Sequence, residues 1–216
     1  MSAADPNRAL PRGPHNLSRE EVELSQRVRL LQAATEAVAE LGYVKTTVAD
    51  VLARAGVSRA TFYQLFRDKE DCFIAAYELN AQFVAAAMSA ELENVRAAGE
   101  LDPLEKLEHV LGVFLTALRS APALARVFLV EVYAAGPAAI EQRRASMEAF
   151  ADIVAETHRG ETGVLGTAVS QRFAAQAFVG SVSAMVTNAI GVGDPDELLR
   201  LHKPLMTLAA QITKKL

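Results

Sequence analysis

Apolar residues at helical spacing, ended by a glycine, set the strongest limit on what the first third of this chain can fold into. Leu31, Ala34, Val38 and Leu41 recur at steps of three and four, which is the pattern of an amphipathic helix. Gly42 follows directly, and glycine often ends a helix because it accepts the positive φ found there. The pattern predicts a helix that buries one face and ends at a defined residue.

Two shorter helices are expected next, joined by a tight turn. Residues 48–55 repeat the apolar stripe, and a glycine-containing turn follows at residues 56–57. Ser58 is placed to cap a third helix, because its hydroxyl can accept a hydrogen bond from a free backbone N–H. On that helix Phe62 and Phe66 should face inward, and the polar and aromatic residues between them should face outward. Two short helices joined by such a turn describe a helix-turn-helix, which reads the major groove of DNA.

A longer set of residues agrees with a known pattern in order and spacing, without a gap. The matching residues are Leu30-Leu31, Ala33-Ala34, Gly42-Tyr43, Thr46-Thr47-Val48, Ala55-Gly56-Val57-Ser58, Phe62-Tyr63, Phe66 and Lys69-Glu70. This segment resembles the DNA-binding domain of TetR-family transcriptional regulators, and the resemblance covers about the first third of the chain. Ala60 stands where the family usually has Gly, and it still permits close approach to DNA. Leu65 stands where a polar residue is common, so a phosphate contact is not expected there.

The third helix and its surroundings supply the candidate DNA contacts. Arg59 can donate two hydrogen bonds to guanine, and Gln64 can pair with adenine. Tyr63 and Lys69 can contact phosphates, which position a protein on DNA without reading its sequence. The complete set of expected contacts is Thr46, Thr47, Ser58, Arg59, Ala60, Thr61, Tyr63, Gln64 and Lys69. For any one of these residues taken alone, an ordinary solvated helix face is the alternative interpretation.

The distribution of charge along the chain supports a local DNA-binding surface. The whole protein carries a formal net charge of −4. Residues 42–69 contain five basic and two acidic residues, whereas residues 72–216 contain 12 basic and 16 acidic residues. A positive field is therefore expected only around the helix-turn-helix, and the acidic remainder would oppose diffuse binding to nucleic acid.

Turn and capping signals divide the 216 residues into three parts. Residues 1–17 hold three prolines and few large apolar groups, which predicts a disordered arm. Residues 18–70 form the expected helix-turn-helix domain, and residues 71–216 form a larger helical domain for ligand binding and dimerisation. The fold class is all-α, because strand-like alternation is missing. Arg8 and Arg12 of the arm could reach the minor groove, although a solvated tail without a role is the simpler interpretation.

The larger domain should begin with a long helix. Asp68 can cap this helix, which runs to about Ala98. Prolines at or near the starts of later apolar segments indicate where further helices begin. These helices are expected near 103–119, 122–134, 137–159, 167–190 and 195–214, with a glycine-rich loop at 160–166.

Small residues crowd the helix expected near 167–190, and they allow another helix to pack closely. The resemblance to TetR-like proteins implies that the last two helices pair with those of a second copy across a two-fold axis. A core helix of a monomer would look similar. The residues expected in the dimer interface are Ala177, Gly180, Ser181 and Ala184.

The middle of the chain mixes aromatic and polar residues in a way that suits a small-ligand site. Such a site is usually an apolar cavity with a few oriented polar groups. Ordinary core aromatics and surface charges are an equally good interpretation of each residue. The candidates are Phe114, Phe128, Glu131, Tyr133, Met147, Phe150 and Arg172.

No sequence pattern indicates catalysis, a metal site or a cofactor. The four histidines are scattered without metal-ligand spacing, and neither a nucleophile motif nor a phosphate-binding loop occurs. The single cysteine, Cys72, suits a reducing compartment and reads most simply as a small buried residue. No apolar run is long enough for a membrane span and no hydrophobic signal core is present, so a cytoplasmic location is expected.

These patterns together predict a DNA-binding transcriptional regulator that is not an enzyme. We expect a homodimer that binds a double-stranded inverted-repeat operator, acts as a repressor and responds to a small, largely apolar effector. The alternative is a helical protein of the same fold with a ligand-binding or scaffold role and weak or no sequence-specific DNA binding.

Overall fold

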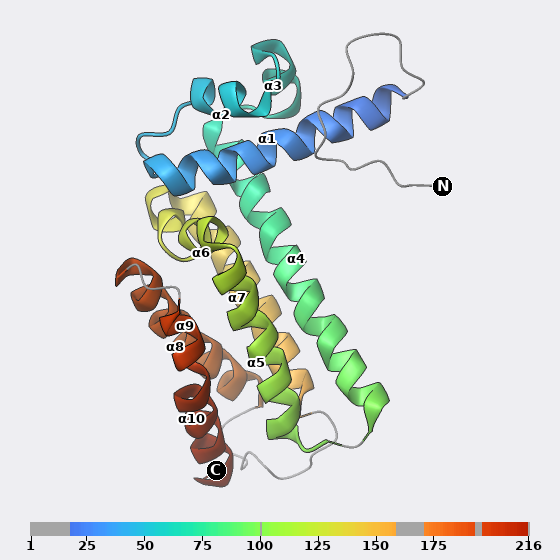
Figure 1. Cartoon of the computed structure of the whole chain (residues 1–216), viewed down its shortest axis with the longest axis vertical. Helices are drawn as coiled ribbons and strands as arrows, with labels where there is room; N and C mark the ends of the chain where they lie inside the picture. The colour runs from blue at the N-terminus through green and yellow to red at the C-terminus, as the bar shows by residue number, and fades with distance from the viewer. Residues whose placement is uncertain (1–17, 100, 159–170, 193–195, 216) are drawn as a thin grey trace.

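The computed structural model describes residues 18–99, 101–158, 171–192 and 196–215, and all regular structure within these ranges is helical (Figure 1). The expected all-α class is confirmed. The expected arm and glycine-rich loop lie outside the described residues. The elements are α1 (Arg19–Leu41), α2 (Val48–Ala55), α3 (Arg59–Leu65), α4 (Lys69–Ala98), α5 (Pro103–Ser120), α6 (Pro122–Leu129), the 3-10 turn η1 (Glu131–Ala134), α7 (Pro137–Glu156), α8 (Gln171–Val192), α9 (Glu197–Arg200) and α10 (His202–Lys215).

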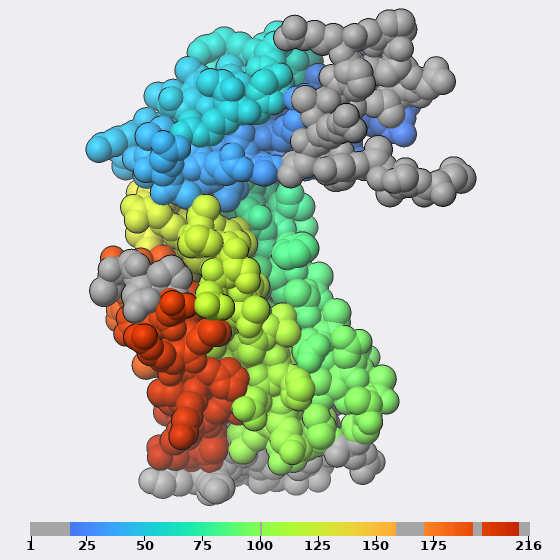
Figure 2. All heavy atoms as spheres, viewed as in Figure 1, coloured from blue at the N-terminus to red at the C-terminus, as the bar shows by residue number. Residues whose placement is uncertain are grey.

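The helices form two parts, which we call the head (α1–α3) and the body (α5–α10). The head is a separate lobe at one end of the elongated body (Figures 1 and 2). The 30 residues of α4 connect the two parts and span about 45 Å at 1.5 Å per residue. α6 is bent by 106° from α5 and packs against α1, so it lies where the body meets the head.

Capping groups begin the helices where the sequence predicts. Ser18 N donates to Glu21 Oε2 at 2.7 Å, and Glu21 N donates to Ser18 Oγ at 3.1 Å, which completes a capping box. At the start of α4, Asp68 accepts a hydrogen bond from Asp71 N at 2.8 Å, and the helix then has the expected length. Gly42 follows α1 with a φ of 78°, which residues with side chains rarely adopt.

Two of the expected helices are broken in the structure. The segment near 122–134 is α6 followed by the tighter turn η1. The segment near 195–214 is divided at Leu201 into α9 and α10. Pro204 explains the second break, because it has no N–H to donate to the carbonyl of Arg200.

Two hydrophobic clusters meet at the first turns of α4. The head cluster includes Leu30, Phe62 and Cys72, whereas the body cluster includes Phe73 and Tyr77. Successive residues of α4 therefore belong to different clusters, and this helix is packed into both. Burial raises the pKa of Cys72 to about 12, so its thiol stays protonated at neutral pH.

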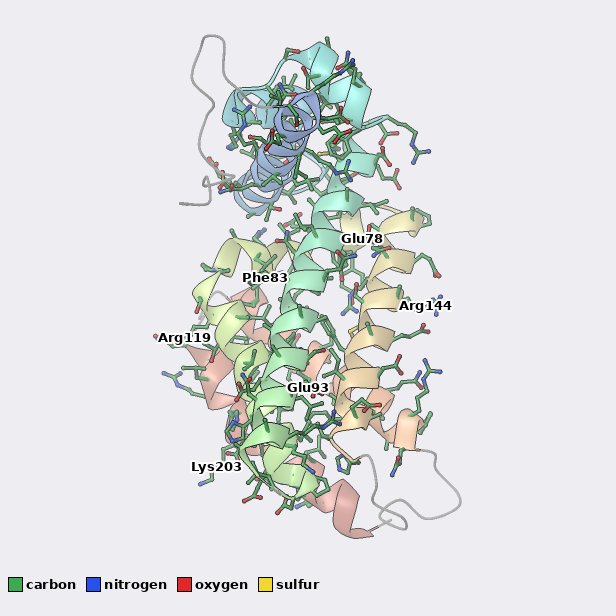
Figure 3. The ribbon with its side chains drawn as sticks, turned by 90° about the vertical axis from the view of Figure 1, so that its right-hand side faces the viewer. Glu78, Phe83, Glu93, Arg119, Arg144 and Lys203 are labelled. Carbon is green, nitrogen blue, oxygen red and sulfur yellow. The ribbon has the colours of Figure 1, made fainter. Side chains whose placement is uncertain are left out.

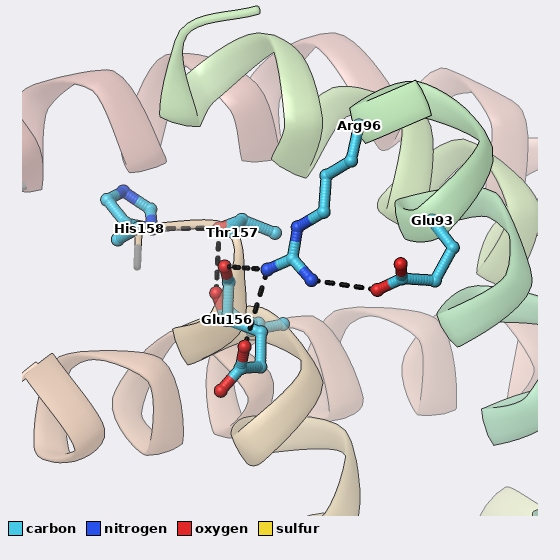
Figure 4. Close-up of polar contacts among 6 residues, drawn as sticks. Glu93, Arg96, Glu156, Thr157 and His158 are labelled. Carbon is cyan, nitrogen blue, oxygen red and sulfur yellow. Dashed lines mark hydrogen bonds and ion pairs between the residues drawn. The ribbon is translucent and has the colours of Figure 1, made fainter. Parts of the chain in front are cut away.

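Arg96 fixes the far end of α4 to the end of α7 (Figure 4). Its Nη2 donates to the carbonyl oxygen of Glu156 at 2.8 Å and lies 3.3 Å from Glu156 Oε2. Its Nη1 pairs with Glu93 Oε1 at 2.8 Å. The Thr157 hydroxyl donates to the carbonyl oxygen of Val154 at 2.7 Å and so satisfies the end of α7. α4 is thus held by side-chain contacts at its far end as well as in the head.

Candidate DNA-binding surface and effector cavity

α3 presents a polar face to solvent because its apolar face is held in the head. Ser58 caps the helix by accepting a hydrogen bond from Thr61 N at 3.1 Å. Phe62 and Phe66 are buried as predicted, and they pack with ring centroids 5.6 Å apart. The residues exposed at the start and along the outer face of α3 are Ser58, Arg59, Ala60, Tyr63 and Gln64, with Thr61 half-buried.

The two threonines between α1 and α2 have different surroundings. Thr47 is exposed and caps α2, and Asp50 accepts a hydrogen bond from Thr47 N at 2.8 Å. Hydrogen bonds from Thr47 lower the pKa of Asp50. Thr46 is buried, and its hydroxyl faces the carbonyl oxygens of Gly42 at 2.8 Å and Ala37 at 3.3 Å. Thr47 is therefore accessible to a phosphate, whereas the hydroxyl of Thr46 is engaged inside the head.

Lys69 joins α4 to the connection between α1 and α2. Its Nζ donates to the carbonyl oxygens of Tyr43 at 2.8 Å and Thr46 at 2.9 Å. The ammonium also lies 4.1 Å from the centroid of the Tyr43 ring. Burial lowers the pKa of Lys69. These contacts give Lys69 a role within the head, and the expected phosphate contact stays a prediction that the geometry does not favour.

Two of the basic side chains between Gly42 and Asp68 form no ion pair with another described residue. Arg54 and Arg67 each form an ion pair with an acidic neighbour. Lys45 and Arg59 are exposed and form no ion pair with any carboxylate in the described part of the chain. Their charges can therefore act on a partner without first breaking an internal contact.

A cavity of about 40 Å³ lies in the body, among α4, α5, α6, α7 and α8. Four of the seven expected ligand residues line it: Phe114, Phe128, Met147 and Phe150. Phe128 stacks on Tyr77 with centroids 4.4 Å apart, and the Phe150 ring lies 5.9 Å from Phe114 and 6.2 Å from Phe128. A cavity of this volume holds only a few water-sized groups, so any larger ligand must displace its wall.

The other three expected ligand residues do not line this cavity. Glu131 lies beyond the end of α6 and is directed toward the end of α1. There its Oε2 accepts a hydrogen bond from Tyr43 N at 2.8 Å. Its Oε1 pairs with Arg126 Nη2 at 3.0 Å. Tyr133 is 55% exposed, and Arg172 forms an exposed ion pair between α7 and α8.

Sequence reasoning missed the polar residues that do line the cavity. These are Tyr77 on α4, Arg143 on α7 and Ser183 on α8. Arg143 Nη2 donates to Ser183 Oγ at 2.6 Å. A signal for Arg143 was present, because it lies at helical spacing from Met147 and Phe150 on the apolar face of α7.

The outer face of α8 carries small residues. Ala177, Gly180 and Ala184 are exposed at helical spacing, and the half-buried Ser181 donates to the carbonyl oxygen of Ala177 at 2.9 Å. A Cβ added at Gly180 would meet no atom within 4 Å. The segment Gln171–Gly191 is long and apolar enough to cross a membrane by length and composition alone, as core helices of soluble proteins also are.

An exposed third helix at the end of an all-helical body is the arrangement found in helix-turn-helix transcriptional regulators. Residues 30–76 match the family model described as bacterial regulatory proteins, tetR family. The match covers the N-terminal domain and confirms the resemblance to TetR-family regulators seen in the sequence. No curated protein sequence matches the chain.

Solved structures of transcriptional regulators share the fold of most of the chain. The fatty acid degradation regulator FadR from Bacillus halodurans is similar with a TM-score of 0.73 and 22% identity, over 85% of this chain and 93% of that chain. FadR from Bacillus subtilis, in complex with stearoyl-CoA, has a TM-score of 0.73 and 21% identity, over 84% and 96% of the two chains. PfmR from Thermus thermophilus has a TM-score of 0.62 and 23% identity, over 88% and 96%.

Proposed function

We propose that this protein is a repressor that binds an inverted-repeat operator as a homodimer and releases it when a small, largely apolar effector binds. The observation that carries the proposal is the exposed face of α3. Arg59, Tyr63 and Gln64 project from a helix that is anchored in the head by the fully buried Phe62, so these side chains can enter a major groove. The cytoplasm is the compartment in which such a protein meets DNA.

The outer face of α8 supports a homodimer. Only 39% of the most apolar stretch of this helix is buried within the protomer, which leaves Ala177, Gly180 and Ala184 available to a second copy. Small side chains let two helices approach closely, and a two-fold axis would place two α3 helices on related half-sites. Ser181, between the exposed positions, belongs to the same proposed interface.

The cavity supports an effector of largely apolar character. Phe114, Phe128, Met147 and Phe150 form its wall, and in the similar FadR from Bacillus subtilis the bound molecule is stearoyl-CoA. An effector larger than a few water-sized groups must move these side chains and the helices that carry them. Binding of such an effector can therefore favour a different arrangement of head and body.

Two contacts connect the cavity wall to the head. Phe128 stacks on Tyr77, which lies on the same turns of α4 that pack into the head. Glu131 follows α6 and accepts the hydrogen bond of Tyr43 N, in the connection that precedes α2. A displacement of α6 therefore acts on α4 and on the head directly. Coupling of about 1–3 kcal/mol, or about 5- to 150-fold in operator affinity, is typical of such a mechanism.

The central test is binding to DNA from the region upstream of the protein's own gene. A labelled fragment should be shifted in the presence of excess non-specific DNA, and the binding should survive moderate salt. If the dimeric protein shows the same affinity for this fragment and for unrelated DNA, sequence-specific regulation at this site is refuted. The scaffold alternative would then be favoured.

A further inference from the structure

Arg143 places a cation in a mostly apolar cavity wall. It lies on α7 at helical spacing with Met147, Phe150 and Val154, and all four residues line the cavity. A position on the apolar face of a helix ordinarily holds an apolar residue. A guanidinium there costs free energy unless something in the cavity compensates its charge.

The contacts of Arg143 within the protein leave its charge uncompensated. Nη2 donates to Ser183 Oγ at 2.6 Å, and the guanidinium lies 5.2 Å from the centroid of the Tyr133 ring. Its Nε is buried and has no hydrogen-bond partner. No Asp or Glu lines the cavity, and no carboxylate among the described residues pairs with Arg143. The surroundings thus supply one neutral acceptor and one aromatic ring, but no anion.

A second unused donor lies in the same wall. Tyr77 is 1% exposed, and its hydroxyl makes no hydrogen bond of acceptable geometry, although the Ser146 hydroxyl is close by. The Ser146 hydroxyl itself donates to the carbonyl oxygen of Gln142 at 3.0 Å. Burial raises the pKa of Tyr77, so its phenol stays protonated and can donate. Unsatisfied buried donors are rare in proteins, and two at one place indicate a missing acceptor.

The polar groups lie at one end of the cavity. Tyr77 and Met88 are eleven residues apart on α4, and so are Arg143 and Val154 on α7, which is about 16 Å along each helix. The residues that carry the polar groups therefore line the head-side end, and the lining of the far end is apolar and includes Leu107. An elongated site with donors at one end matches a molecule with an anionic head and an apolar tail.

We propose that the effector is an amphipathic anion, with its oxyanion held by Arg143, Ser183 and Tyr77 and its apolar chain directed toward Met88, Leu107 and Val154. This inference rests on the proposed effector-binding function. A carboxylate or a phosphate can accept two hydrogen bonds from one guanidinium and a third from the Tyr77 hydroxyl. The head group would therefore sit next to the Tyr77–Phe128 stack, at the end of the cavity nearest α6.

The test compares three probes with the same ten-carbon tail: decanoate, decyl phosphate and neutral 1-decanol. Calorimetric titration of the DNA-free protein measures their affinities for the wild type, Arg143→Met and Arg144→Met. Methionine keeps an unbranched apolar side chain at position 143. Arg144 is the matched control, since it lies on the same helix but points to solvent (Figure 3).

Arg143→Met should lower the affinity for whichever anion binds by about 10- to 100-fold and change the affinity for 1-decanol by no more than about twofold. Arg144→Met should leave all three affinities unchanged. The relative affinities of decanoate and decyl phosphate for the wild type identify which oxyanion fits.

The proposal is overturned if 1-decanol binds the wild type as tightly as both anions, or if Arg143→Met weakens 1-decanol and the anions equally. It is also overturned if none of the three probes binds. Operator binding is measured separately on the same preparations. A protein that binds its operator but fails the anion test therefore leaves the proposed regulatory function standing.

Discussion

Glu131→Gln tests the contact between body and head with a change that keeps the shape of the side chain. Glu131 is 8% exposed, and its Oε2 accepts the hydrogen bond of the buried Tyr43 N–H at 2.8 Å. A hydrogen bond to a charged group contributes about 1.5–3 kcal/mol and a neutral one about 0.5–1.5, so the substitution should lose about 1–2 kcal/mol there. The half-exposed pair with Arg126 adds at most about 1 kcal/mol.

Urea unfolding followed by circular dichroism measures this loss. Glu131→Gln should lower the free energy of unfolding by about 1–3 kcal/mol, whereas Arg126→Gln, which leaves Tyr43 N–H paired, should lower it by less than about 1 kcal/mol. Glu23→Gln, at an exposed position of α1, is the control for loss of one negative charge. If Glu131→Gln and Glu23→Gln unfold at the same urea concentration, the buried carboxylate does not hold the head to the body.

Three further predictions follow from the head, the α8 face and the cavity. Arg59→Ala should reduce the binding free energy for a matched operator by about 1–3 kcal/mol and relax the preference at one base position, whereas Lys45→Ala should lower the affinity for matched and mismatched DNA alike. Fluorescence anisotropy measures both affinities. If both substitutions have the same effect on both sites, Arg59 does not read a base. Gly180→Leu has room within the protomer, so sedimentation should show monomers of normal helix content, and an unchanged dimer would exclude this face from the interface. Phe128→Ala should abolish the response to effector and cost about 3–5 kcal/mol of stability, since the ring is buried and stacked on Tyr77; a variant of normal stability that still responds would show that Phe128 neither packs the wall nor transmits the signal.

The head could be predicted almost residue by residue, because its signals are local. Ser18 with Glu21 and Ser58 with Thr61 are pairs three residues apart that form their hydrogen bonds within one turn. Lys69 is an exception, because its contacts are not local in the sequence. Its position at the start of α4 suggested an exposed charge, but its partners are the carbonyl oxygens of Tyr43 and Thr46, more than twenty residues earlier. Long-range packing decides such contacts, and spacing along the chain does not encode it.

For the same reason, the sequence allowed only apolar residues of the cavity lining to be predicted, namely three phenylalanines and Met147. Phe128 and Phe150 follow apolar spacing on α6 and α7, and a core position can be recognised from that pattern. Whether Glu131 faces the cavity or α1 depends on the break after α6, for which the sequence carries no clear stop signal. The place of Arg143 in the cavity lining is seen only from its contact with Ser183, forty residues later in the chain.

The shared helix α4 explains why a small change in the cavity can reach DNA in the proposed mechanism. Cys72 and Ala76 pack into the head, while Phe73 and Tyr77, the next residue in each case, pack into the body cluster. Close-packed interiors do not absorb displacement by compressing, so a ligand that pushes the Tyr77–Phe128 stack must move the first turns of α4. Arg96 holds the opposite end of the helix against α7, which leaves tilting as the motion open to α4. In a dimer that tilt would change the separation of the two α3 helices, and an operator with fixed half-site spacing would then be bound less tightly.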